Sequence, residues 1–310
     1  MLTKESFSEL LAQGPCLLDG ATGSNLRLAG MPKGVSTELW VLENPESLVA
    51  LQRAYARAGC QIIYAPTFQA QPIALKAQGM EQHTERINAS LAALSRSAAP
   101  DCLIAGDLTT LAAFCDSWDP DNFDLLVENY RRQIRGLIDG GADLLVDNYR
   151  RQIRGLLDGG VDLLVAETLL YPQEAEAIVT AAELECAGAC MYSFTMQPNG
   201  SLFSGAPAAP VLRELEKAGA AAVGFNCVGA DAMTPGLVSR LRRALKGPLL
   251  CKPNAGNPVI NPQGIAEYSM APEEFSSILL QCRKNGAQLL GGCCGTDPRF
   301  LAAAHQALFR

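Results

Sequence analysis

Eight short apolar runs of strand length recur along this chain, with longer helical stretches between them. The runs are residues 16–21, 61–68, 102–108, 162–168, 188–195, 221–227, 249–256 and 287–294. Their hydrophobicity is continuous rather than alternating, which is typical of parallel strands buried on both faces. Eight such strands alternating with helices predict an α/β fold, specifically a (β/α)8 TIM barrel.

An open, doubly wound sheet is the rival α/β architecture. It would need a glycine-rich turn with the spacing G-x-G-x-x-G after its first strand. The first run continues into Asp19-Gly20-Ala21-Thr22-Gly23, which lacks that spacing. The length of 310 residues suits one barrel domain spanning residues 1–310, and the hydrophobic content of 48% is enough for a large core.

Two of the stretches between the runs have recognisable helix limits. In residues 47–59, Leu48, Leu51 and Tyr55 keep helical spacing, and Gly59 provides a C-terminal stop. Residues 272–286 begin with a proline and two glutamates, which favour the first turn of a helix. Both stretches are expected to be helices of the barrel.

A tandem duplication interrupts the pattern. Residues 124–142 are repeated almost verbatim at 143–161, and each copy predicts an amphipathic helix. In the first copy, one face carries Tyr130, Ile134, Leu137 and Ile138. Because a barrel needs only one helix here, we expect one copy to be an insertion. It would form an extra surface helix, residues 143–146 would be a linker or helix end, and the fourth strand would follow at 162–168.

Charge and hydropathy exclude several classes of partner. With 25 Lys and Arg against 32 Asp and Glu, the formal net charge is -7, which argues against nucleic acid and against an anionic membrane surface. No uninterrupted apolar run of about 18 residues occurs that could span a membrane. The N-terminal segment has mixed charge and lacks the apolar core of a signal peptide. These features predict a cytoplasmic protein.

Polar and sulfur side chains follow the predicted strands. In a barrel of this kind, the carboxyl ends of the strands and the loops after them build the active site. The residues at these ends are Asp19, Thr67, Asp107, Glu167, Thr195, Asn226, Cys227, Asn254, Cys293 and Cys294. We therefore expect the chemistry of this protein at one mouth of the barrel.

The segment Gly291-Gly292-Cys293-Cys294-Gly295-Thr296 carries the strongest chemical signal. Glycines beside adjacent cysteines permit the backbone conformations that two neighbouring thiols need to reach one centre. With Cys227 they offer three thiolates, and three protein ligands leave one position of a tetrahedral zinc for substrate. The alternatives are buried thiols or a vicinal disulfide, and spacing alone leaves the participation of Cys227 open. Most of the other cysteines among the eleven lie in apolar runs and are expected to pack as small hydrophobes.

Four motifs resemble the signatures of the homocysteine S-methyltransferase family. They are residues 18–23 (LDGATG), 224–227 (GFNC), 253–256 (PNAG) and 291–296 (GGCCGT). The resemblance covers nearly the whole chain outside the duplicated unit. That family includes homocysteine methyltransferases that use betaine or S-methylmethionine, and also the homocysteine domain of cobalamin-dependent methionine synthase. The resemblance implies a methyltransferase that forms methionine from homocysteine on a zinc-binding barrel.

The resemblance also implies residue roles. Cys227, Cys293 and Cys294 match the zinc ligands, and homocysteine would supply the fourth. Asp19 and Glu167 match the acidic positions that hold the substrate amino group; a carboxylate at a strand end is suited to pairing with an ammonium. The remaining substrate-binding candidates are Asn254, near the metal, and Ala21, Thr22, Thr67 and Thr195, whose amides and hydroxyls could receive the substrate carboxylate.

The methyl donor is not specified by these motifs. Residues 65–68 (APTF) and 203–207 (FSGAP) are less polar than the family's usual segments, and both are expected near the mouth. The donor is expected to be a small sulfonium of the S-methylmethionine type, or methylcobalamin on a partner protein. In the second case the chain would be a component or fragment of a corrinoid-dependent methionine synthase. A third possibility is a zinc- or thiol-binding barrel without catalysis.

Overall fold

The computed structural model describes residues 1–111, 142–185, 187–203, 205–262 and 266–309. Eight parallel strands form one sheet in the order β1-β10-β7-β6-β5-β4-β3-β2. A parallel bridge between Leu18 and Ile62 joins the two ends of that order and closes the barrel. The strands are β1 (Cys16–Leu17), β2 (Ile62–Tyr64), β3 (Leu103–Thr109), β4 (Leu163–Leu169), β5 (Cys190–Phe194), β6 (Ala222–Gly229), β7 (Leu249–Asn254) and β10 (Leu289–Leu290).

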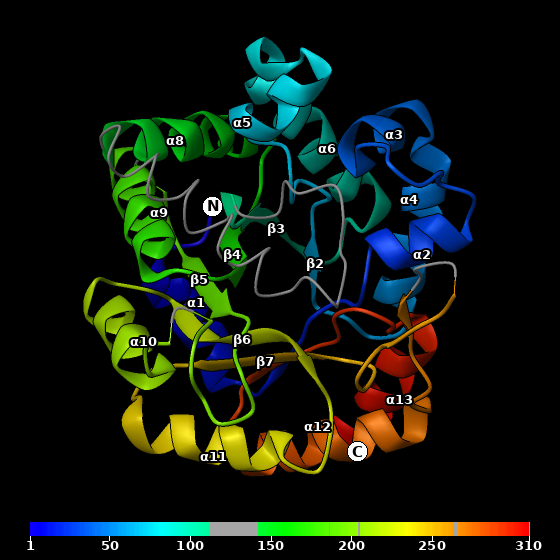
Figure 1. Cartoon of the computed structure of the whole chain (residues 1–310), viewed down its shortest axis with the longest axis vertical. Helices are drawn as coiled ribbons and strands as arrows, with labels where there is room; N and C mark the ends of the chain where they lie inside the picture. The colour runs from blue at the N-terminus through cyan, green and yellow to red at the C-terminus, as the bar shows by residue number, and fades with distance from the viewer. Residues whose placement is uncertain (112–141, 186, 204, 263–265, 310) are drawn as a thin grey trace.

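Each of the eight predicted apolar runs overlaps one of these strands, so the predicted TIM barrel is confirmed. Helices surround the strands, with α8 and α9 on one side of Figure 1 and α3 and α4 on the other. The longer helices are α1 (Lys4–Ala12), α4 (Pro45–Arg57), α6 (Thr84–Ala98), α8 (Ala142–Asp158), α9 (Pro172–Leu184), α10 (Ala208–Lys217), α11 (Thr234–Ala244), α12 (Pro272–Lys284) and α13 (Pro298–Leu308). The shorter ones are α2 (Gly23–Leu28), α3 (Thr37–Glu43) and α5 (Pro72–Leu75), with single 3-10 turns at Lys76–Gln78 and Glu81–His83.

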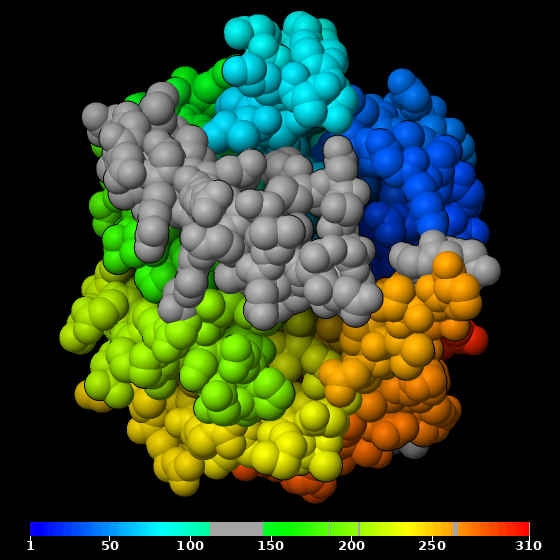
Figure 2. Space-filling view, in the orientation of Figure 1, coloured from blue at the N-terminus to red at the C-terminus, as the bar shows by residue number. Residues whose placement is uncertain are grey.

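The two helices predicted from their limits are present as α4 and α12. Leu48 and Tyr55 of α4 are fully buried, as the helical spacing requires, and α12 begins at Pro272. In Figure 2 the chain colour progresses around the molecule from blue to red, because each strand–helix unit lies beside the next. Among the helices of the described ranges, none combines the length and the apolar character needed to cross a bilayer.

The core has an inner and an outer layer. Inside the barrel, alternate strand residues such as Ile62, Val165 and Leu289 pack together, and α1 adds Phe7 and Leu11 to this cluster. Phe7 is fully buried, so α1 plugs the amino end of the barrel. The larger outer layer lies between the strands and the surrounding helices. Helix α1 thus covers the amino end of the barrel, and the polar residues lie at the opposite end, at the carboxyl ends of the strands.

The second copy of the duplicated unit forms the helix between β3 and β4. Helix α8 contains residues 143–146, so the prediction of a helix end is confirmed and that of a linker is wrong. Its inward face carries Tyr149, Ile153 and Leu156, all fully buried, as its amphipathic pattern indicates. The strand after it is β4, as expected. The predicted extra helix of the first copy lies outside the described residues.

A small antiparallel strand pair lies at the carboxyl end of the barrel. It consists of β8 (Val259–Ile260) and β9 (Ala266–Glu267), and it follows β7. The next residues return to the mouth, where the ring of Tyr268 packs so closely on Gly295 that an added Cβ would lie 2.3 Å from it. Gly295 has a φ of 78°, a left-handed conformation that glycine adopts without strain.

Candidate metal and substrate site

Three cysteines from two distant parts of the chain meet at the barrel mouth. Cys227 lies on β6, while Cys293 and Cys294 follow β10, and their sulfur atoms all lie within 4.8 Å of one another. The Sγ atoms of Cys227 and Cys294 are 3.9 Å apart. Tetrahedral zinc with Zn–S bonds of about 2.3 Å would place two sulfurs about 3.8 Å apart. All three are free thiols in this structure.

Backbone hydrogen bonds hold the adjacent cysteines against β7. The amide of Cys293 donates to the Pro253 carbonyl over 2.7 Å, and the Cys294 carbonyl accepts from Ala255 over 2.9 Å. The Asn254 side-chain oxygen accepts from the Cys294 amide over 3.1 Å. The structure thus gives Asn254 a role in fixing the backbone of Cys294. The sequence had placed it near the metal without indicating this contact.

Two strand irregularities turn residues into the mouth. The β4–β5 register shifts between Ala166 and Leu169, and the β6–β7 register shifts between Asn226 and Gly229. At these points Thr168 has a φ of 57° and Cys227 a φ of 55°, which are strained values for residues with a Cβ. Bulges of this kind redirect side chains beside functional sites. Here one redirects the segment after Glu167 and the other redirects Cys227.

The thiols of the metal-free cluster cannot all ionise together. Hydrogen bonds from Cys227 and Cys293 lower the pKa of Cys294 well below its usual range, despite the cost of burial. Hydrogen bonding with Cys293 and Cys294, together with burial, raises the pKa of the Cys227 thiol far above its usual range. Hydrogen bonding among the thiols therefore favours a thiolate at Cys294 and disfavours one at Cys227. A divalent cation is what would allow the other two to become thiolates.

A second cluster, of buried acids, lies at the same mouth. Asp19, Asp107 and Glu167 are each 8% exposed or less. Burial raises the pKa of all three carboxyls: Glu167 reaches about 7, and the Asp107 pKa is raised further by the negative charge of Glu167. Asp19 Oδ2 accepts a 2.9 Å hydrogen bond from the Tyr64 amide. Asp19 Oδ1, Asp107 Oδ1 and Glu167 Oε2 receive no well-formed hydrogen bond from the described chain.

Lys252 is the functional residue that the sequence analysis missed. Its Nζ lies 3.2 Å from Asp19 Oδ1, 3.7 Å from Glu167 Oε2 and 4.1 Å from the centre of the Tyr64 ring. Its side chain is 4% exposed. Burial lowers the Lys252 pKa, but the charges of Glu167 and Asp19 outweigh burial and keep it well above its usual value. A lysine inside the apolar run 249–252 was the available signal, because a buried cation requires partners.

The other predicted substrate residues lie around the mouth, and several already have partners. The Thr67 hydroxyl donates to the Asp107 carbonyl over 2.9 Å, and the Thr195 hydroxyl donates to the Cys227 carbonyl over 3.2 Å. The Ala21 amide donates to Thr296 Oγ1 over 3.2 Å. Thr22 precedes α2 and makes no side-chain capping bond there. In this structure Thr67 and Thr195 brace strand ends.

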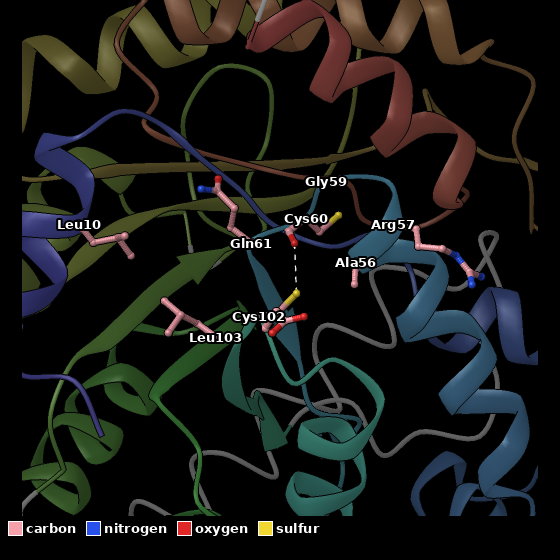
Figure 3. Close-up of a pocket in the computed structure, with 9 residues that line it drawn as sticks. Leu10, Ala56, Arg57, Gly59, Cys60, Gln61, Cys102 and Leu103 are labelled. Atoms are coloured by element: carbon pink, nitrogen blue, oxygen red, sulfur yellow. Dashed lines mark hydrogen bonds between the residues drawn. The ribbon is translucent and has the colours of Figure 1, made fainter.

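A cavity in the described structure lies away from this mouth. It has a volume of about 510 Å³ and lies beside the amino ends of β2 and β3, with Arg57, Cys60, Gln61 and Cys102 among its lining residues (Figure 3). The Cys102 thiol donates to the Cys60 carbonyl over 3.3 Å, and burial raises the pKa of both thiols. Their burial fits the packing role that the sequence indicated for cysteines in apolar runs.

Comparisons with known proteins agree with this site. The family model "Homocysteine S-methyltransferase" matches residues 16–146 and 145–308, two stretches that meet inside the second copy of the duplicated unit. Homocysteine S-methyltransferase of Escherichia coli K12 is 27% identical over 93% of this chain and 93% of its own length. The metallated crystal form of homocysteine methyltransferase MmuM from Escherichia coli superposes with a TM-score of 0.77, at 27% identity, over 96% of this chain and 98% of that one.

A methyltransferase from Methanosarcina mazei shares the fold, with a TM-score of 0.60 at 11% identity over 99% of this chain and 98% of that one. This more distant likeness concerns the barrel alone. The family model, by contrast, spans nearly the whole chain, including all three clustered cysteines. The chain belongs to the homocysteine S-methyltransferase family.

Proposed function

We propose that this chain transfers a methyl group to the thiol of homocysteine, forming methionine, with zinc as its metal. The observation that carries the proposal is the position of the three-cysteine cluster beside buried carboxylates at one barrel mouth. Thiols supply the ligands for a metal that activates another thiol, and carboxylates suit the ammonium of an amino acid. Membership of the family supports the same reaction.

Cys227, Cys293 and Cys294 would hold the zinc, and their sulfur separations fit one tetrahedral ion. When bound, zinc would lower the pKa of the homocysteine thiol so that its sulfur is nucleophilic at neutral pH. The new bond joins that sulfur to the methyl carbon, while the bond between methyl and donor breaks and its electron pair leaves with the donor. Asn254 and Thr195 keep the backbone of Cys294 and Cys227 in place.

Asp19 and Glu167 would hold the substrate ammonium. Both are buried, and each has a carboxylate oxygen that lacks a well-formed hydrogen bond from the described residues. An ammonium with three N–H donors would satisfy such oxygens. The carboxylate of the substrate would be received near Ala21 and Thr22, at the start of α2. Fixing both ends of the amino acid orients the thiol toward the incoming methyl group.

The donor in this proposal is a small sulfonium of the S-methylmethionine type. The alternative is methylcobalamin on a partner protein, in which case the chain is the homocysteine-activating component of a corrinoid system. Residues 1–310 would act as one barrel domain, in the reducing conditions of the cytoplasm that keep the three thiols available. The near-complete mutual coverage with the Escherichia coli enzyme supports a barrel of similar extent.

The first test is zinc content of the reduced protein, compared with Cys293→Ser and with Cys251→Ser as a matched control. Cys251 is also fully buried but lies on β7 outside the cluster. We expect about one zinc per chain in the parent and in Cys251→Ser, and none in Cys293→Ser. X-ray absorption should then show homocysteine sulfur joining the zinc shell. A reduced parent that takes up no added zinc would overturn the mechanism.

Activity assays then separate the donors. Methionine formed from homocysteine and S-methylmethionine supports the self-sufficient enzyme. Methionine formed only with a methylcobalamin-carrying protein supports the corrinoid component. Zinc and homocysteine binding without transfer from either donor would leave a non-catalytic thiol-binding barrel.

A further inference from the structure

Lys252 lies among the groups that the proposed function assigns to the substrate ammonium. Its side chain enters from β7, on the strand position that pairs with Asn226 of β6. Its Nζ is within 4 Å of both Asp19 and Glu167, although these two residues come from β-strands far apart in the sequence. All three side chains are 10% exposed or less. One lysine thus joins two carboxylates in a nearly water-free space.

The charges of Asp19, Glu167 and Lys252 indicate which kind of substrate suits this pocket. Two buried carboxylates with no cation would repel each other, and each would carry a large desolvation cost. When both carboxyls are ionised, the trio of Asp19, Glu167 and Lys252 has one surplus negative charge, and the neighbouring Asp107, whose pKa burial raises well above its usual value, adds none while it is protonated. A substrate with one ammonium group brings the trio to neutrality. The pocket is therefore matched in charge to a monoamino substrate, provided that Lys252 stays in place when the substrate binds.

Several contacts hold Lys252 in place independently of the substrate. Its ammonium lies over the face of the Tyr64 ring at 4.1 Å, a favourable cation–π position. The amide of the same Tyr64 donates to Asp19 Oδ2 over 2.9 Å, so the ring and the carboxylate are fixed by one residue. Asp19 Oδ1 and Glu167 Oε2 meet Lys252 as ion-pair partners without a well-formed hydrogen bond. Those oxygens retain capacity for a second cation.

We propose that Lys252 is a positioning residue for substrate selection: it fixes the Asp19 and Glu167 carboxylates relative to each other, so that the pocket accepts one substrate ammonium. Lys252 touches the carboxylates and acts on the substrate through them. Lys252 and the substrate ammonium would share the same two oxygens, Asp19 Oδ1 and Glu167 Oε2, each of which can accept from two donors. This inference rests on the proposed function, because it takes homocysteine as the molecule whose ammonium enters.

The test compares homocysteine with 4-mercaptobutanoate, which has the same thiol and carboxylate but no amino group. Binding to the zinc-loaded, reduced protein is measured by isothermal titration calorimetry. For Lys252→Met, which keeps the length of the side chain without its charge, we expect homocysteine affinity to fall roughly tenfold to a hundredfold. Affinity for 4-mercaptobutanoate should stay within about twofold, because that ligand makes no use of the carboxylates. Lys252→Arg should recover part of the loss for homocysteine.

Lys246→Met serves as the control, because Lys246 is an exposed lysine on the loop before β7. It should leave both affinities unchanged. Tighter homocysteine binding in Lys252→Met would overturn the proposal, since it would mean that Lys252 competes with the substrate. Equal losses for the two ligands, or no change for either, would also overturn it and leave a packing role. Failure of the proposed function would be recognised separately, as a parent protein that binds homocysteine no better than 4-mercaptobutanoate.

Discussion

The side chain of Asn226 makes two hydrogen bonds to Thr168, one with its backbone amide and one with its side-chain hydroxyl. Asn226 Oδ1 accepts from the Thr168 amide over 2.8 Å, and Asn226 Nδ2 donates to the Thr168 hydroxyl over 2.7 Å. Asn226 directly precedes Cys227, and both Cys227 and Thr168 have positive φ angles. One amide therefore ties the two strained strand ends together. It links the segment that carries Glu167 to the segment that carries a proposed zinc ligand.

Replacing Asn226 by alanine should weaken zinc binding without removing a ligand. The fully buried Asn226 also lies 3.9 Å from Cys293 Sγ through its Nδ2, so it orients thiols from two strands. Loss of such supporting contacts typically costs metal affinity on the order of tenfold to a hundredfold. Competition with a chromogenic zinc chelator would measure the change. Ser193→Ala, which removes only a 3.0 Å bond to Asn226 Oδ1, should cost less; equal affinity of Asn226→Ala and parent would contradict the role.

Glu167 should make the stability of the metal-free protein fall as pH rises. Burial raises its folded pKa from 4.5 to about 7. The folded state holds this proton more tightly, so its contribution is complete below about pH 4.5 and is lost as pH rises through about 7. Relative to Glu167→Gln, the free energy of unfolding of the parent should drop by on the order of 3 kcal/mol across that window. Urea unfolding at fixed pH values measures this difference, and a pH-independent difference would sink the prediction.

Among the cysteines of the described residues, Cys294 should be the most reactive thiol of the metal-free protein. Its pKa is lowered by hydrogen bonds from Cys227 and Cys293, and it is half-buried, whereas Cys251 and Cys282 are fully buried. The thiolate is the reactive form of cysteine. Brief treatment with iodoacetamide followed by peptide mass spectrometry should show Cys294 labelled first, and zinc should protect it. Faster labelling of Cys251 would be inconsistent with this site.

The duplicated unit offers a test of which segments the barrel requires. Deleting 124–142 and deleting 143–161 leave nearly the same sequence, because the two copies differ at only three positions. Among the described residues, helix α8 is the one between β3 and β4. We expect both deletion variants to fold, bind zinc and unfold cooperatively, as followed by circular dichroism. Loss of folding in both would show that the chain depends on having two copies.

The sequence was sufficient for the barrel and for the adjacent cysteines Cys293 and Cys294, because each rests on a local pattern, whereas Cys227 was added by the family resemblance. Continuous apolar runs identify buried parallel strands, and the glycine-flanked Cys293 and Cys294 identify a place where thiols converge. It was insufficient for Lys252, whose partner Asp19 lies more than two hundred residues earlier in the chain. It also missed the two bonds between Asn226 and Thr168, since a bulge and a positive φ leave no pattern in residue type. Interactions across the mouth depend on closure of the barrel, which local patterns do not describe.

Helix α1 closes one end of the barrel with the buried side chains of Phe7 and Leu11. Molecules that react at the cysteine cluster must therefore arrive and depart through the opposite end. In a site with a single opening, a two-substrate reaction is limited by exchange, because an amino acid that has not left blocks the entry of the next one. In the proposed reaction the product differs from homocysteine only by a methyl group on sulfur, so it would fit the same ammonium pocket. Release would then depend on the weaker binding of a thioether to the metal, so that the sulfur, rather than the amino group, would set the rate of each cycle.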